Sequence, residues 1–246
     1  RLKGDVLGDL PEKNENVVYA EMAGEQDKLY RASASKLARS IAKQLPEDFA
    51  GSKLQVLAEL SKLRELCCDP SLLYGNYTGG SAKLDTCMEL ISTALEADHS
   101  VLLFSQFTSM LDLIAARLDS DGVAYQMLTG STSKEKRFQE CAVPVFLISL
   151  KAGGVGLNLT AADIVIHYDP WWNVAAENQA TDRAHRIGQT RTVTVFKLIV
   201  KDTIEEGILA LQQRKRELAD SVVGGEALGS TSITRDDVLA LLDAGR

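Results

Sequence analysis

Residues Asp163 to Val200 read DIVIHYDPWWNVAAENQATDRAHRIGQTRTVTVFKLIV, and this segment gives the clearest indication of the fold. It opens and closes with the apolar runs DIVIHYD and VTVFKLIV, each of which predicts a strand. The segment between them predicts a helix from about Val174 to Ile187. Because these strands are apolar runs and not alternating patterns, they favour a parallel sheet that helices cover on both faces.

The same alternation of helix and strand begins at Ser81 and adds predicted strands at Val101–Phe107, 124–130 and Val145–Ser149. Few residues remain for a crossover helix near 137–143. Either that helix is brief, or a mobile segment is missing from the sequence.

The part of the chain before this alternation reads as mainly helical, with one strand candidate at Val17–Met22. We therefore predict an α/β fold, a parallel sheet with helices on both faces, preceded by a mainly helical N-terminal segment. The predicted parts are residues 1–80, residues 81–222 and a tail, residues 223–246, which contains a short helix at Thr234–Asp243.

Composition and charge limit the function classes. The chain has 246 residues, 45% of them hydrophobic, which is ordinary for a globular protein. A net charge of −7 argues against a general nucleic-acid binder, so a nucleic-acid role must come from a local patch or from a missing part of the parent protein. No apolar run approaches the roughly 20 residues that cross a bilayer. The first residues contain no apolar region of the kind found in a secretory signal, and we predict no membrane role. The sequence also lacks an initiator methionine, so we interpret the chain as a fragment of a longer protein.

No metal or phosphate-loop pattern is present. The cysteines (Cys67, Cys68, Cys87 and Cys141) form no Cys-x-x-Cys pair, and the three histidines are scattered. We interpret the cysteines as reduced packing residues and predict no metal site. The sequence also lacks a Gly-x-x-x-x-Gly-Lys-Ser/Thr loop, so the chain has no phosphate cradle of its own.

Two loops follow strands, where an open α/β sheet usually binds its ligand. In SLKAGGVGLNLT, Gly154 and Gly156 let the backbone approach a ligand closely, although a steric role in a tight turn is equally consistent. In DPWWN, Trp171 and Trp172 are candidates for stacking on bases. Packing against the core explains these tryptophans better, because tryptophans are usually buried.

The segment after this loop concentrates positive charge. Gln179, Arg183 and Arg186 are spaced by four and three residues, so they share one face of the predicted helix. A guanidinium is permanently charged and presents a planar fork of donors, so two of them beside a glutamine make a receptor for phosphate oxygens. The alternative is a solvated helix face on which Asp182 and Glu177 neutralise the arginines. Residue types and spacing leave both interpretations open.

Taken together, these segments resemble the second RecA-like lobe of the Swi/Snf family of DNA-dependent ATPases, in helicase superfamily two. The resemblance covers nearly the whole chain. LRELCCDP, with Asp69 where the family more often has histidine, VLLFSQFTSMLDLI and YQMLTGSTSKEKR resemble the earlier family segments. VFLISLKAGGVGLNLT and the Asp163–Val200 stretch resemble the last motifs almost without a break, and the C-terminal ending is most like bacterial members.

This resemblance implies an ATP-driven translocase on double-stranded DNA that remodels protein–DNA complexes. A first RecA-like lobe, absent from this chain, would bind most of the ATP and its Mg²⁺, so the chain alone would not hydrolyse ATP. Arg183 and Arg186 would act as arginine fingers on the γ-phosphate. The implied nucleotide-binding residues are Gln179, Gly154, Gly156 and Asp182, and the candidates for DNA-backbone contact, by position at strand ends, are Ser105, Gln106, Ser149 and Lys151.

The implied partners are double-stranded DNA, the first lobe and a nucleoprotein target, in the bacterial cytoplasm or, for a eukaryotic source, the nucleus. A strand-separating helicase on DNA or RNA stays open as an alternative. So does a non-catalytic nucleic-acid-binding or regulatory module, although intact Gln179, Arg183 and Arg186 argue against lost catalysis. A nicotinamide-binding domain is disfavoured because GGVG does not fit the Gly-x-Gly-x-x-Gly spacing.

Overall fold

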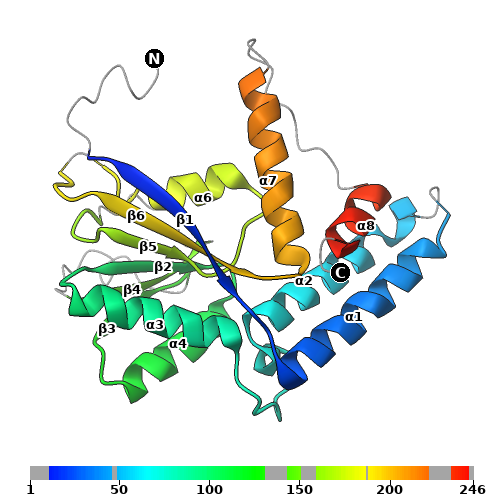
Figure 1. Cartoon of the computed structure of the whole chain (residues 1–246), viewed down its shortest axis with the longest axis horizontal. Helices are drawn as coiled ribbons and strands as arrows, with labels where there is room; N and C mark the ends of the chain where they lie inside the picture. Colours follow the sequence, from blue (N-terminus) through cyan, green and yellow to red (C-terminus); the bar gives the residue numbers. More distant parts are fainter. Residues whose placement is uncertain are drawn as a thin grey trace. The chain divides into compact units, whose positions relative to one another are not determined.

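The computed structural model describes residues 11–45, 49–130, 143–150, 159–186, 188–221 and 234–243. Within these residues, no helix is both long and apolar enough to cross a membrane. Figure 1 labels the elements, which are β1 (Lys13–Ala20), α1 (Gly24–Ala42), α2 (Phe49–Cys68), the 3-10 turn η2 (Pro70–Leu72), α3 (Ala82–Glu96), β2 (Val101–Ser105), α4 (Thr108–Ser120), β3 (Tyr125–Leu128), β4 (Val145–Ser149), β5 (Ile164–His167), α6 (Val174–Thr181), β6 (Val193–Val200), α7 (Ile204–Ser221) and α8 (Arg235–Asp243).

Six strands form one sheet in the order β1-β6-β5-β2-β4-β3. The central strand β2 pairs in parallel with both neighbours, so Val101 lies opposite Val145 of β4 and Ile164 of β5. Every residue of β2 and β5 is buried, because both faces of these strands are covered. The structure therefore confirms the predicted α/β class and the parallel sheet.

Helices cover both faces of this sheet because its crossovers run in opposite directions. α4 leads from β2 toward the β3 edge, whereas α6 leads from β5 toward the β1 edge. Right-handed crossovers therefore place α4 and α6 on opposite faces. Figure 1 shows α3 and α4 in front of the sheet and α6 behind it.

The chain divides into two compact units. The first consists of Arg1–Val18 with Leu84–Leu198, and the second of Tyr19–Lys83 with Ile199–Arg246. The first unit holds most of the sheet with α4 and α6. The second unit joins the N-terminal helices α1 and α2 to the C-terminal helices α7 and α8, which pack against them. The boundaries proposed from the sequence at residues 80 and 222 stay a prediction.

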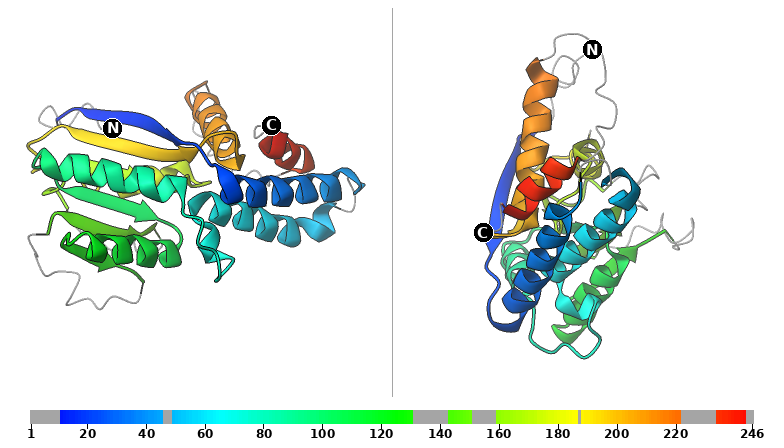
Figure 2. Two further views of the ribbon diagram at one scale, coloured as in Figure 1. Left: turned by 60° about the horizontal axis from the view of Figure 1, so that its bottom comes forward. Right: turned by 90° about the vertical axis from the view of Figure 1, so that its right-hand side faces the viewer.

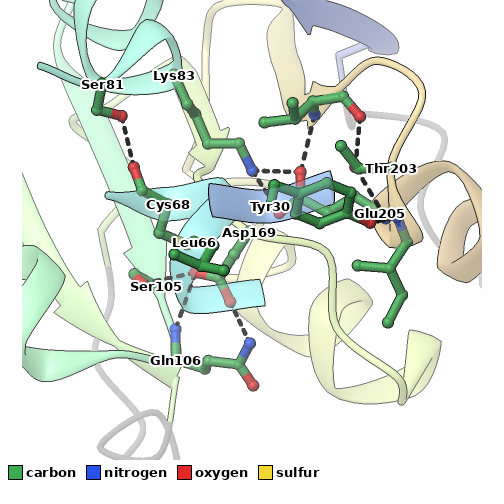
Figure 3. Close-up of polar contacts among 12 residues, drawn as sticks. Tyr30, Leu66, Cys68, Ser81, Lys83, Ser105, Gln106, Asp169, Thr203 and Glu205 are labelled. Carbon is green, nitrogen blue, oxygen red and sulfur yellow. Dashed lines mark hydrogen bonds and ion pairs between the residues drawn. The ribbon is translucent and has the colours of Figure 1, made fainter. Parts of the chain in front are cut away.

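A buried ion pair lies inside the second unit (Figure 3). The ammonium of Lys83, at the start of α3, is 2.5 Å from both carboxylate oxygens of Glu205 in the first turn of α7, and both side chains are fully buried. Glu205 also accepts a hydrogen bond from the backbone N–H of Val200 at 2.8 Å. Burial alone would lower the pKa of Lys83, but the carboxylate of Glu205 and the nearby thiols raise it by more, so the lysine is charged.

Two polar side chains tie α1 into the same unit. The hydroxyl of Tyr30 accepts the backbone N–H of Ile204 at 2.6 Å. The side chain of Gln26 donates to the carbonyl of Leu66 at 2.9 Å and accepts from the backbone N–H of Ala82 at 3.2 Å. The buried polar groups of Tyr30 and Gln26 are therefore satisfied by specific partners, which links α1 to its neighbours in this unit.

Local features at two helix ends and at the cysteines fit the residue types found there. Gly122 follows the C-cap of α4 with a φ of 70°, in the left-handed region that favours glycine at the end of a helix. The short helix predicted in the tail is α8, and a capping pair begins it, because Thr234 N–H donates to Asp237 at 2.9 Å and Asp237 N–H donates to the Thr234 hydroxyl at 3.2 Å. The buried, free cysteines are Cys67, Cys68 and Cys87, while Cys141 lies outside the described residues.

Candidate functional site

One buried carboxylate joins the carboxyl ends of β2 and β5. Asp169 follows β5 and is 1% exposed. Its Oδ1 accepts hydrogen bonds from Ser105 Oγ at 2.6 Å and from the backbone N–H of Gln106 at 3.2 Å. Its Oδ2 accepts from Gln106 Nε2 at 2.5 Å (Figure 3). Three donors of β2 and its loop therefore converge on one residue of the DPWWN loop. The sequence marked this residue only as the end of a strand.

These contacts determine what the DNA-contact candidates can do. Ser105 is fully buried and donates its hydroxyl to Asp169, and Ser149 is buried opposite it in the β2–β4 register. Gln106 is half-buried and is therefore the one of these three that reaches solvent. Lys151 lies outside the described residues.

The helix that carries Gln179 is shorter than the sequence predicted. α6 ends at Thr181, and the chain continues as turns through Arg186. The prediction that Gln179, Arg183 and Arg186 share one helical face is therefore wrong. Gln179 lies in α6, whereas both arginines follow its end.

Tertiary contacts explain why the helix stops. The backbone N–H of Leu159 donates to the carbonyl of Arg183 at 3.3 Å, and the imidazole Nε2 of His185 is 2.7 Å from the carbonyl of Pro11. Such contacts override helical periodicity. Both partners precede strands, so the arginine segment, residues 182–186, lies at the amino ends of β5 and β1. The arginines and Asp169 therefore lie at opposite ends of β5.

Gln189 braces the arginine segment, a role that sequence reasoning missed. It is 7% exposed, and its carboxamide contacts only backbone groups among the described residues. Its Nε2 lies 2.9 to 3.3 Å from three backbone carbonyl oxygens, those of Thr160, Ala162 and Ala184. Its Oε1 accepts the backbone N–H groups of Thr190 and Arg191, both at 2.9 Å. The preceding Gly188 has a φ of 102°, so this sharp turn requires glycine.

The two arginines differ in exposure. Arg183 is 5% exposed, whereas Arg186 is exposed. Burial and, second, the positive charge of Arg186 lower the pKa of Arg183, so the two guanidinium groups lie within electrostatic reach of each other. An anion bound at Arg186 would relieve this repulsion. Of the residues assigned to the nucleotide, Gln179 is exposed, Asp182 is half-buried, and Gly154 and Gly156 lie outside the described residues.

A second buried ion pair fixes α6 to the sheet. The ammonium of Lys197 in β6 is 2.6 Å from Glu177 Oε1 in α6, and the side chains are 9% and 2% exposed. The other carboxylate oxygen of Glu177 accepts the backbone N–H of Trp171 at 3.3 Å, which ties the DPWWN loop to the same helix. The lysine within the apolar run VTVFKLIV is the signal that could have found this pair, because a buried charge needs a partner.

His167, at the end of β5, holds the last turn of α6. Its Nε2 is 2.8 Å from the hydroxyl of Thr181, its ring stacks on Phe104, and its Nδ1 has no hydrogen-bond partner in the part of the chain that the structure describes. Burial is the main cause that lowers the pKa of His167 to about 4, while Glu177 and Lys197 act in opposite directions. The imidazole is therefore neutral at physiological pH.

This shift predicts a pH-dependent stability. Between pH 6.5 and about 4, His167 is protonated in the unfolded chain but stays neutral in the folded chain. The free energy of unfolding should therefore fall as the pH falls through this window, by about 3 kcal/mol in total. His167→Gln should remove this component. The measurement is urea unfolding of both proteins between pH 7 and pH 4, and parallel pH curves would contradict the assignment.

The chemistry of the site follows from its charges. Among the residues that the structure describes, no group of three or more His, Cys, Asp or Glu side chains could hold a metal ion. An arginine keeps its proton in proteins, so Arg186 and Arg183 can stabilise negative charge but cannot act as a general base. The arrangement suits recognition of phosphate oxygens.

Similar sequences are known. The family described as "Helicase conserved C-terminal domain" matches residues 82–188. The chain is 38% identical over 250 residues to an "Uncharacterized ATP-dependent helicase" of Mycoplasma pneumoniae, with 99% of this chain and 24% of that protein covered. The chain spans about a quarter of the length of the curated relatives it matches.

Similar structures are known as well. The Sulfolobus solfataricus SWI2/SNF2 ATPase C-terminal domain is 30% identical, with a TM-score of 0.71 and coverage of 94% of this chain and 98% of that one. The Sulfolobus solfataricus SWI2/SNF2 ATPase core in complex with dsDNA is 34% identical, with a TM-score of 0.72 and coverage of 89% and 48%. These likenesses confirm the RecA-like fold class that the sequence predicts.

Proposed function

Because the chain belongs to the Swi2/Snf2 family of ATPases, as its C-terminal lobe, we propose that it is the second lobe of an ATP-driven translocase on double-stranded DNA. The Mycoplasma relative is named an ATP-dependent helicase, and one structural neighbour is described as a complex with dsDNA. The observation that carries the proposal is the exposed Arg186 beside the buried Arg183, two like charges held at the amino end of β5.

In this proposal ATP binds between this lobe and a first lobe of the full-length protein. The first lobe carries the phosphate loop and Mg²⁺, and Arg186 reaches the γ-phosphate. Arg183, behind it, adds positive charge where negative charge develops in the transition state, and an arginine finger is worth about 10³ to 10⁵ in rate. Gln179, Asp182, Gly154 and Gly156 contribute to nucleotide binding. The chain alone would then hydrolyse ATP at a negligible rate.

The proposed DNA contacts lie at the other end of β5. Gln106 is the contact that the described geometry favours, because Asp169 fixes its orientation and its side chain is half-buried. Ser105 and Ser149 are buried, so in this proposal they support the strand ends next to Gln106 and do not touch DNA. Lys151 is a further candidate for DNA contact. Contacts to the backbone position a protein without reading sequence, which suits movement along any duplex. Closure of the lobes on ATP and reopening after hydrolysis would produce that movement and displace bound proteins.

Translocation is distinguished from strand separation by two substrates. The full-length protein is incubated with ATP and either a duplex that carries a bound third strand or a forked duplex. We expect ATP-dependent release of the third strand and no separation of the fork, because duplex tracking leaves base pairs intact. Efficient separation of the fork would favour the strand-separating helicase instead.

A further inference from the structure

Helix α1, in the second unit, packs beside α2 (Figure 2). It carries a row of exposed positive charges that the proposed ATP site does not use. We call this the α1 basic row, and its members are Lys28, Lys36 and Arg39 of α1 and its C-cap residue Lys43. Their spacing of eight, three and four residues places them on one helical face. The opposite face is buried and consists of Gln26, Tyr30, Leu37 and Ile41.

The charges of this row are not neutralised within the described chain. None of its four side chains makes an ion pair or a hydrogen bond with another described residue. The acidic residues of α1, Glu25 and Asp27, both lie in its first turn, and Asp27 pairs with Arg31 at 3.1 Å. The helix therefore presents unneutralised positive charge in a chain whose net charge is −7.

Three other exposed cations in the described part of the chain do have acidic partners. Lys62 lies 2.7 Å from Glu59, Lys201 lies 3.0 Å from Glu21, and Arg117 lies 3.5 Å from Asp121. Surface ion pairs contribute little stability, but they cancel the local field. The α1 basic row keeps its field, and a field of one sign over a helix face attracts a polyanion.

We propose that the α1 basic row binds the phosphate backbone of double-stranded DNA, as a contact surface separate from the strand-end residues. The proposal rests on the proposed function, which supplies DNA as the polyanion. From Lys28 to Lys43 the helix rises about 22 Å at about 1.5 Å per residue. That length matches about six base pairs at about 3.4 Å per step, so the row can follow several phosphates.

The rest of this face favours duplex over other anionic partners. Between Lys28 and Lys43 the remaining exposed side chains are small, namely Ala32, Ser40 and Ala42. Without an exposed aromatic ring, this face offers no platform on which single-stranded bases could stack. Without a large apolar side chain, it offers no anchor for an acidic peptide. Lysine and arginine side chains alone suit sequence-independent phosphate contact.

The test compares two matched triple variants of the full-length protein. Lys36→Gln, Arg39→Gln and Lys43→Gln remove three charges from the row. Lys62→Gln, Arg117→Gln and Lys201→Gln remove the same residue types from paired surface sites. Glutamine has a helix propensity close to that of lysine and arginine, so both variants should fold, which circular dichroism verifies.

Affinity for a generic 30-base-pair duplex is measured from 50 to 200 mM NaCl. The row variant should bind at least about tenfold more weakly at low salt, and its slope of log K against log salt should be shallower by about 2 to 3. The control variant should change neither quantity. ATP turnover at saturating duplex should be unchanged in both variants.

Two results would overturn the proposal. In the first, the row variant and the control variant bind duplex equally well. In the second, duplex binding is unchanged in the row variant but binding of a polyglutamate peptide is lost, which would identify an acidic protein as the partner. Failure of the proposed function gives a different result, because the rate of ATP turnover by the wild-type protein would then not depend on DNA. The salt dependence of duplex binding would still show whether the α1 basic row contacts DNA.

Discussion

Replacing Arg186 with alanine in the full-length protein should lower kcat for ATP hydrolysis by about 10³-fold or more. The guanidinium is exposed and lies beside the buried Arg183, so its loss removes transition-state stabilisation without opening a cavity in the core. Binding of ATP and of DNA should stay close to wild type, because the first lobe and the DNA-contact surfaces are unchanged. Steady-state turnover at saturating duplex and equilibrium nucleotide binding measure the two effects separately.

Two further variants sharpen this test. Arg186→Lys keeps the charge but loses the planar fork of donors, so it should restore only a small part of the activity. Arg117→Ala removes another exposed arginine, whose partner is Asp121, and should leave turnover unchanged. Turnover of Arg186→Ala within a few-fold of wild type would contradict the finger role. Arg183 is a poorer test, because a buried side chain also supports folding.

Replacing Lys83 with methionine should destabilise the chain by about 3 to 5 kcal/mol. The substitution leaves the carboxylate of Glu205 fully buried without the ammonium that contacts both of its oxygens. Burial already raises the pKa of Glu205, and Lys83 is the main group that opposes this shift. The free energy of unfolding is measured by urea denaturation at pH 7, followed by far-ultraviolet circular dichroism.

The matched control for this pair is the double variant Lys83→Met with Glu205→Gln. The glutamine keeps an acceptor for the backbone N–H of Val200 but carries no charge, so most of the lost stability should return. Equal destabilisation of the single and double variants would contradict the account. It would indicate that packing of the lysine stem, and not its charge, is what matters.

The sheet could be predicted because its strands are long apolar runs. The run VFLIS coincides with β4 (Val145–Ser149), and the strand of DIVIHYD contains β5 (Ile164–His167). β1 (Lys13–Ala20) was placed less accurately, at Val17–Met22, because most of its side chains are exposed and give no apolar signal. In α2, Leu54 is 83% exposed although it is apolar, because the buried face of that helix is centred on Leu60 and Leu63.

The site was harder to predict because its geometry comes from contacts distant in sequence. Helical periodicity predicted a helix that continues through Arg186. In the structure α6 ends at Thr181, because contacts with Leu159 and Pro11 hold the arginine segment in turns. The sequence marked Asp169 as the end of a strand, and only the meeting of β2 and β5 reveals the donors that converge on it. The residue types at the site could therefore be predicted from the sequence, but their arrangement in space could not. The roles given to the predicted site residues stay predictions.

We propose above that this lobe works in a motor driven by ATP and stimulated by double-stranded DNA. The most direct measurement is ATP turnover by the full-length protein alone, with duplex DNA, and with single-stranded DNA of the same length. We expect low turnover without DNA, strong stimulation by duplex and much weaker stimulation by single strands. Turnover that is equal under all three conditions would contradict this proposal.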